Sequence, residues 1–154
     1  GKLKIPGFSD YLHFYGENRL LGIGMSVDED TQVTDGVKLS MFDLSDKTDV
    51  KEENKLVLKN VYSTDVSYDY KAALVDPGKN LIGFAAGTEG GEKYFLFGYD
   101  EKKGFRCHLS ERINGSSPNA ARGVYIEEVL YVARGNVIEG YSLKDYKKVD
   151  DIIL

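Results

Sequence analysis

"KNLIGFAAG", Lys79–Gly87, is the stretch that decides the fold, because the chain contains two further segments that resemble it. The upstream segment is "NRLLGIGMS" (18–26), and the downstream one is "EVLYVARG" (128–135). Each is a short run that is apolar at successive positions and is bounded by turn residues. Such runs predict β-strands that are buried on both faces.

The same succession of elements surrounds each of the three runs. A strand and a tight turn precede the run, and a hairpin and a strand ending in an aromatic residue follow it. The aromatic is followed by a small polar residue every time: Phe42-Asp43, Tyr99-Asp100 and Tyr141-Ser142. The aromatics are 57 and 42 residues apart, close to the ~40–50 residues of a four-stranded propeller blade.

The sequence therefore predicts an all-β fold, a β-propeller fragment of about three four-stranded antiparallel blades. The approximate blades are 11–61, 70–113 and 121–154, and residues 1–8 resemble the outer strand of a preceding blade. Stacking is the physical reason for the repetition, because a lone four-stranded sheet cannot cover both of its apolar faces. The glycines of the apolar runs, Gly22, Gly24 and Gly83, would let neighbouring sheets approach closely. The alternative is a β-sandwich or meander with coincidental internal similarity.

Composition excludes some functions. The net charge of −5 argues against non-specific binding of nucleic acid, which needs a basic surface. No apolar run approaches the ~20 residues that span a bilayer, and the start of the chain lacks the apolar region of a signal peptide. The single cysteine, Cys107, excludes an intrachain disulfide, and its place in the alternating run "FRCHL" predicts a buried side chain.

Four motifs carry a family resemblance: "IPGFSDYLH", "LLGIG", "KLSMFDLSD" and "DPGKNLIGF". With them the chain resembles a family of bacterial secreted proteins whose C-terminal propeller is distantly related to WD-type repeats. The resemblance covers essentially the whole chain and is strongest from Leu3 to Ala86. It implies an exported bacterial protein, extracellular or in the cell envelope, and supplies no activity. Tyr70 stands where the family tends to carry a histidine, which weakens any role for a histidine pair with His13.

Three blades are too few to close a ring, since propellers usually have ~4–8. We therefore expect either a piece of a longer propeller or a homodimer in which two copies complete the ring. An open end would expose an apolar sheet face, which favours self-association.

Two loops are candidate sites. "VDEDTQVTDG" (27–36) gathers carboxylates, and Asp28, Asp30 and Asp35 are calcium candidates, because hard oxygen ligands suit Ca²⁺. A solvated acidic hairpin is the alternative, since Gln32 stands where a further ligand is expected. "VYSTDVSYDYKAAL" (61–74) holds Tyr62, Tyr68 and Tyr70, rigid amphipathic side chains suited to contacting a protein or glycan partner. Packing within the fold is the alternative for these tyrosines.

The two histidines are expected to lie far apart. His13 is placed on a first strand, nearest the propeller channel, where a partner-binding role is conceivable. His108 is placed on a fourth strand at the outer edge, so a two-histidine metal site is not expected.

No catalytic residues and no cofactor are predicted, because the chain lacks a nucleophile elbow and a phosphate-binding loop that opens a helix. The sequence favours a non-catalytic propeller module of an exported bacterial protein that binds a protein or glycan partner or serves as a scaffold. One alternative is an exported hydrolase or lyase with an acidic site, formed from Asp28, Asp30, Asp65 and Asp69. Another is a purely structural part of a larger ring.

Overall fold

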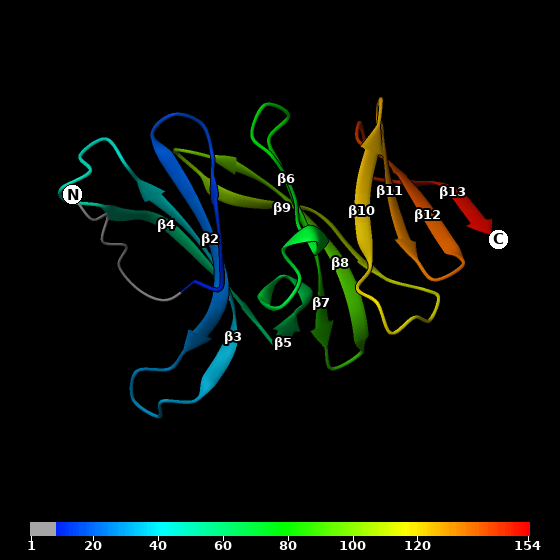
Figure 1. The fold of residues 1–154 in the computed structure, drawn as a ribbon, viewed down its shortest axis with the longest axis horizontal. Coiled ribbons are helices and arrows are strands. Elements are labelled where there is room, and N and C mark those ends of the chain that lie inside the picture. The colour runs from blue at the N-terminus through cyan, green and yellow to red at the C-terminus, as the bar shows by residue number, and fades with distance from the viewer. Residues whose placement is uncertain (1–8) are drawn as a thin grey trace.

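The computed structural model describes residues 9–154, which form three antiparallel sheets side by side (Figure 1). The first sheet consists of β1 (Tyr11–Phe14), β2 (Arg19–Val27), β3 (Thr34–Asp43) and β4 (Lys51–Lys59). The second consists of β5 (Val61–Thr64), β6 (Leu74–Asp76), β7 (Leu81–Thr88), β8 (Gly91–Asp100) and β9 (Gly104–Arg112). The third consists of β10 (Arg122–Ile126), β11 (Val129–Arg134), β12 (Val137–Ser142) and β13 (Lys148–Ile153).

The predicted fold class is confirmed, since each sheet is a four-stranded meander in chain order apart from the division of one strand. The strand predicted for residues 1–8 lies outside the described residues. No helix among residues 9–154 has the length and hydrophobicity needed to cross a bilayer.

The second sheet begins earlier than the expected residue 70. β5 pairs with β7 from Val61 to Thr64, and β6 pairs with the same edge of β7 from Leu74 to Asp76. Together β5 and β6 act as one first strand that is interrupted by residues 65–73. This interruption, hereafter the excursion, contains two 3-10 turns, η1 (Asp65–Ser67) and η2 (Tyr70–Ala72), which lie in front of the sheet in Figure 1.

The second sheet is buried on both faces, as the unbroken apolar run of β7 predicts. One face packs against the first sheet through a core that includes Ile82, Phe84, Phe97, Leu21 and Ile23. The other face packs against the third sheet through a core that includes Leu81, Tyr94, Leu96, Leu130 and Val132. The stacking expected from the repeat is therefore what holds the chain together.

The aromatic that ends each third strand is a reliable marker of the repeat. Tyr99 belongs to the core with the first sheet, and Tyr141 belongs to the core with the second. Phe42 packs with Leu20 and Leu44 on the face that points away from the second sheet. Tyr99 and Tyr141 thus face the preceding sheet, and Phe42 faces the side on which no further sheet is described.

The apolar runs are offset from one another in the structure. Leu21 faces the second sheet and Leu81 faces the third, so these two residues occupy equivalent positions. The overlay of "LLGIG" on "LIGFAAG" matches Leu20 with Leu81 instead, which is wrong by one residue. The reason is that the first hairpin extends further beyond the equivalent pair: seven residues separate His13 and Leu21, and four separate Asp76 and Leu81. An odd difference in length changes which of two faces a strand residue meets.

Cys107 is exposed, so the prediction of a buried side chain is wrong. The residue lies on β9, the outer strand of the second sheet, beside a register shift in the pairing with β8. Such irregularities disturb the simple alternation of inward and outward side chains on which the prediction depended.

Two tyrosines of β8 have opposite hydrogen-bonding environments. The Tyr94 hydroxyl is buried between Gly83 and Gly123, where an added Cβ on either glycine would overlap it. It has no hydrogen-bond partner among residues 9–154, and burial raises the pKa of Tyr94 well above its ordinary value. The Tyr99 hydroxyl instead donates to the Glu53 carboxylate and accepts a 2.8 Å hydrogen bond from Asn54 Nδ2.

These environments predict opposite effects of one substitution. We expect Tyr94→Phe to raise the free energy of unfolding by about 1 kcal/mol, because a buried unpaired hydroxyl is removed. We expect Tyr99→Phe to lower it by about 1–2 kcal/mol, because two hydrogen bonds are lost. Urea denaturation of both variants beside the parent protein measures the difference. Destabilisation of similar size in both variants would contradict the assignment of Tyr94 as unpaired.

Candidate functional site

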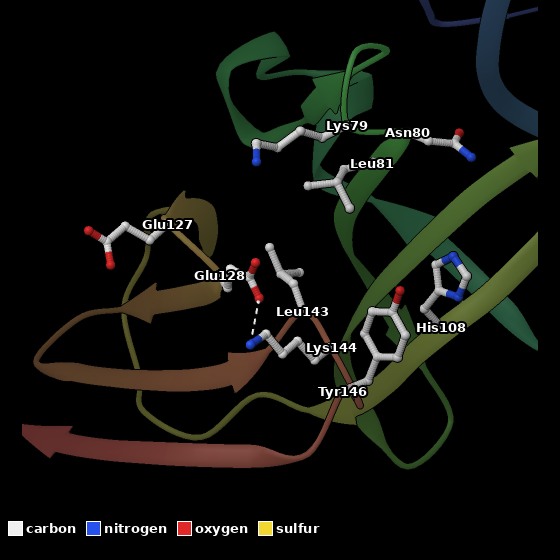
Figure 2. Close-up of a pocket in the computed structure, with 9 residues that line it drawn as sticks. All are labelled: Lys79, Asn80, Leu81, His108, Glu127, Glu128, Leu143, Lys144 and Tyr146. Atoms are coloured by element: carbon white, nitrogen blue, oxygen red, sulfur yellow. Dashed lines mark ion pairs between the residues drawn. The ribbon is translucent and has the colours of Figure 1, made fainter.

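A cleft of about 520 Å³ opens between the second and third sheets, at the upper end of Figure 1, where first strands turn into second strands. Residues from both sheets line it and are drawn in Figure 2: Lys79, Asn80, Leu81, His108, Glu127, Glu128, Leu143, Lys144 and Tyr146. Its size falls within the usual range for small-ligand sites, ~300–1,000 Å³.

Three tight turns bring these residues together. The β6–β7 turn supplies Lys79 and Asn80, and it is fixed by a 3.1 Å hydrogen bond from the Lys79 N–H to Asp76 Oδ1. The β10–β11 turn is only two residues long and supplies both glutamates. The β12–β13 turn supplies Leu143, Lys144 and Tyr146.

Charges of both signs surround the cleft. Lys144 Nζ lies 3.4 Å from Glu128 Oε2, across the lower side of the cleft in Figure 2. Both side chains are largely exposed, so this ion pair contributes little to stability. Glu127 points away from the other lining residues (Figure 2).

Lys79 lies on the opposite side of the cleft, with Nζ 5.2 Å from the centre of the Tyr125 ring. The Tyr125 hydroxyl donates a 2.5 Å hydrogen bond to Asp76 Oδ2. This bond and the Lys79 N–H hold the pKa of Asp76 below its ordinary value. A cation over an aromatic face is favourable, so Lys79 stays extended over the rim of the cleft.

One wall of the cleft is aromatic. The rings of His108 and Tyr146 stack with centres 4.7 Å apart and planes 4° apart. Burial, and then the nearby charge of Arg106, lower the pKa of His108, so the imidazole is neutral at pH 7. The neutral stacked pair, together with Leu81 and Leu143, is the apolar part of a lining that is otherwise polar and charged.

The cleft offers an ion pair, a stacked ring pair and two leucines to a ligand. None of the lining residues forms a hydrogen-bonded nucleophile–base pair in residues 9–154. Within the same residues, no three His, Cys, Asp or Glu side chains converge as metal ligands would.

The calcium candidates lie in the β2–β3 loop, at the opposite end of the sheets from the cleft (Figure 1). Asp28 Oδ1 accepts hydrogen bonds from the N–H groups of Asp30 (2.9 Å) and Thr31 (3.1 Å). These bonds lower the pKa of Asp28 and stabilise the loop without a metal. Asp35 lies on β3 and is exposed. This geometry gives the calcium hypothesis no support.

Tyr62, Tyr68 and Tyr70 are exposed by 58%, 77% and 69% respectively. Tyr62 lies on β5, and the other two lie on the excursion. Two of the three tyrosines predicted to form one binding surface, Tyr68 and Tyr70, thus lie on one short segment. His13 lies on β1 of the first sheet, where it is exposed and stacks on Tyr11 with ring centres 6.2 Å apart.

The excursion is held in place by polar contacts of its own. The Tyr68 hydroxyl donates a 2.5 Å hydrogen bond to Asp65 Oδ1. Asp69 accepts from the Lys71 N–H at 3.0 Å and lies 3.6 Å from Arg122 of the third sheet. These contacts orient the exposed tyrosines without burying them.

The four carboxylates of the proposed acidic enzyme site are engaged in separate contacts. Asp65 lies beside Glu92, whose pKa is raised by burial and then by Asp65, and Glu92 pairs with Arg134. Asp69 pairs with Arg122, and Asp28 and Asp30 belong to the loop of the first sheet. No contact among residues 9–154 joins the two pairs of aspartates.

Sequence reasoning missed the cleft. Its residues come from three turns and one outer strand that are up to 67 positions apart, from Lys79 to Tyr146, and no motif links them. The sequence places His108 on an outer strand and links it to no binding site. Tyr146 stacks on it only because the third sheet packs against the second.

Comparison with known proteins gives a family and two relatives. The sequence model of a family described as "Beta propeller domain" matches residues 1–146. An uncharacterised protein of Archaeoglobus fulgidus is 36% identical over 154 residues, covering 100% of this chain and 22% of that protein. An uncharacterised protein of Methanocaldococcus jannaschii is 43% identical over 138 residues, covering 85% and 19%. The chain thus spans about a fifth of these relatives, and both are archaeal, whereas the resemblance implied a bacterial origin.

The lowered pKa of His108 predicts a pH-dependent stability. The unfolded chain binds a proton with a pKa near the ordinary 6.5, and the folded protein binds it only at lower pH. The stability contributed by neutral His108 is therefore full above about pH 6.5 and is lost as the pH falls through the folded pKa.

His108→Phe keeps a ring against Tyr146 and removes the titration. We expect the variant to lose less stability than the parent between about pH 7.5 and about pH 5.5, as measured by urea denaturation. Parallel losses in the two proteins would show that His108 does not titrate in this way.

Proposed function

This chain belongs to the Beta propeller domain family, and we propose that it is a non-catalytic share of a larger ring that binds a protein or glycan partner. An exported location, outside the cell or in its envelope, is part of the proposal. The observation that carries it is the exposure of apolar side chains on the two terminal sheets.

Each terminal sheet exposes its first strand on the face turned away from the second sheet. On β1, Leu12 (44% exposed) and Phe14 (64%) stand opposite Gly22 and Leu20, which share that outward face. On β10, Val124 (54%) and Ile126 (62%) stand opposite Tyr131 and Val129. The core residues Leu130 and Val132 point the other way.

The equivalent first-strand positions of the second sheet are covered. Val75 packs into the core with the first sheet, and Leu74 packs into the core with the third. The same kind of position is therefore half-buried against a core where a neighbouring sheet is present and exposed where none is described. Further sheets of the same construction would cover Leu12, Phe14, Val124 and Ile126.

The excursion supports the binding part of the proposal. It interrupts a first strand whose pairing with β7 needs no insertion, and it displays Tyr68 and Tyr70 beside a polar framework. Tyrosines contribute large rigid contact areas at binding surfaces.

The open face of the third sheet predicts self-association. We expect this chain to associate at micromolar concentration, as measured by light scattering, and the variant Val124→Lys/Ile126→Lys to associate less, because charge opposes burial of the face. Val27→Lys/Val33→Lys is the matched control, since both valines are exposed, Val27 at the end of β2 and Val33 in the β2–β3 loop. A monomeric parent protein, or equal effects of the two double variants, would contradict the proposal.

Stability measurements distinguish a binding role of the tyrosines from a packing role. We expect Tyr62→Ala and Tyr70→Ala each to change the free energy of unfolding by less than about 0.5 kcal/mol, as is usual for exposed side chains. Losses of about 2 kcal/mol or more by urea denaturation would identify them as packing residues instead.

A further inference from the structure

The cleft between the second and third sheets has a counterpart between the first and second sheets. This groove, of about 340 Å³, lies at the same end of the molecule and is lined by residues that include Tyr15, Arg19, Asn80 and Tyr99. Both openings lie beside the turn from a first to a second strand and beside the turn after a third strand. The repeat therefore provides two versions of one site.

Tyr15 fills the first version. Its side chain is only 8% exposed, and its hydroxyl donates a 2.5 Å hydrogen bond to Asn80 Oδ1. Its ring meets that of Tyr99 edge-on, with centres 6.5 Å apart and planes 82° apart. An aromatic ring supplied by the chain itself thus bridges the first and second sheets.

The second version lacks such a ring because its hairpin ends sooner, whereas the first hairpin continues through the pair Phe14–Leu20 before it turns. In the first sheet, seven residues separate the cross-strand partners His13 and Leu21. In the second sheet, four separate the equivalent partners Asp76 and Leu81. The β6–β7 turn places Lys79 at the rim, and the larger cleft beneath it stays open.

We infer that this cleft binds an aromatic side chain of a partner protein, a tyrosine in an exposed segment, in the way that the groove holds Tyr15. The inference rests on the proposed binding role and names the partner chemistry. Leu81 and Leu143 offer apolar contact, and the stacked ring of Tyr146 offers an aromatic wall. Offset and edge-to-face ring contacts are favourable beyond the apolar area they bury.

The charged side chains that line the cleft sum to zero, which favours a neutral ring over a charged ligand. Lys79 and Lys144 balance Glu127 and Glu128, so the four charges sum to zero. The Lys144–Glu128 pair needs no external counterion. A free carboxylate or ammonium on the ligand would therefore gain little in this site.

The test uses N-acetyl-tyrosinamide, a neutral tyrosine, as the probe. Titration followed by NMR should shift the signals of Leu143 and Tyr146 at millimolar probe. N-acetyl-alaninamide should leave them unmoved, and the anionic N-acetyl-tyrosine should bind no more tightly than the neutral probe. Absent shifts at these residues, or equal shifts with the alanine analogue, would overturn the inference.

Variants separate the cleft from the excursion. Tyr146 has a φ of 62°, which asparagine adopts readily, so Tyr146→Asn removes the wall without straining the turn. We expect it to weaken binding of the probe about tenfold, the effect of losing one ring contact. Tyr70→Asn on the excursion should leave the affinity unchanged. Equal losses in both variants would place the probe elsewhere.

A second variant tests the inference from the other opening. Tyr15→Ala empties the groove, so N-acetyl-tyrosinamide should bind at two sites and raise the Tm of this variant more than that of the parent. An equal rise in both proteins would contradict the equivalence of the two openings. Failure of the probe experiments would leave the ring proposal standing, because that proposal is judged by self-association.

Discussion

Face-to-face burial of β-sheets is the constraint on which this structure depends. The Tyr94 hydroxyl shows how closely the sheets approach, because it lies between Gly83 of its own sheet and Gly123 of the next. Any side chain at either glycine would push Tyr94 out and separate the sheets. The hydroxyl lacks a hydrogen bond there, so the packing of the ring between two bare backbones must outweigh the cost of burying it. Contact between sheets, more than polar pairing, decides this interface.

The parts of the fold that follow from burial alone were predictable. An apolar run such as Leu81–Ala86 needs cover on both faces, and an aromatic at the end of a third strand needs a neighbour, so three such units predict stacked sheets. The predictions that were wrong depend on hairpin length and on irregularities within strands. The one-residue offset of Leu21 from Leu81 and the exposure of Cys107 arise from such local insertions, whose effect on side-chain direction the sequence does not reveal.

The candidate site was predictable only in part. The tyrosines of residues 61–74 were candidates for a partner surface, with packing in the fold as the alternative, but nothing in the sequence indicates that residues 65–73 interrupt a strand. The cleft could not be anticipated, because Lys79, His108 and Tyr146 meet only after the third sheet packs on the second. The opening also depends on where the β6–β7 hairpin ends, and the linear sequence does not indicate this.

The excursion with its tyrosines and the cleft lie at different places relative to the stacked sheets. Tyr68 and Tyr70 project from a first strand, while the cleft lies at one end of the interface between two sheets. The cleft exists because one repeat fails to supply the ring that its neighbour supplies through Tyr15. Repetition sets the walls of each opening, and the length of one hairpin decides whether the chain fills the opening, as Tyr15 does, or leaves it open. The openings between sheets can thus differ while the packing of the sheets stays constant.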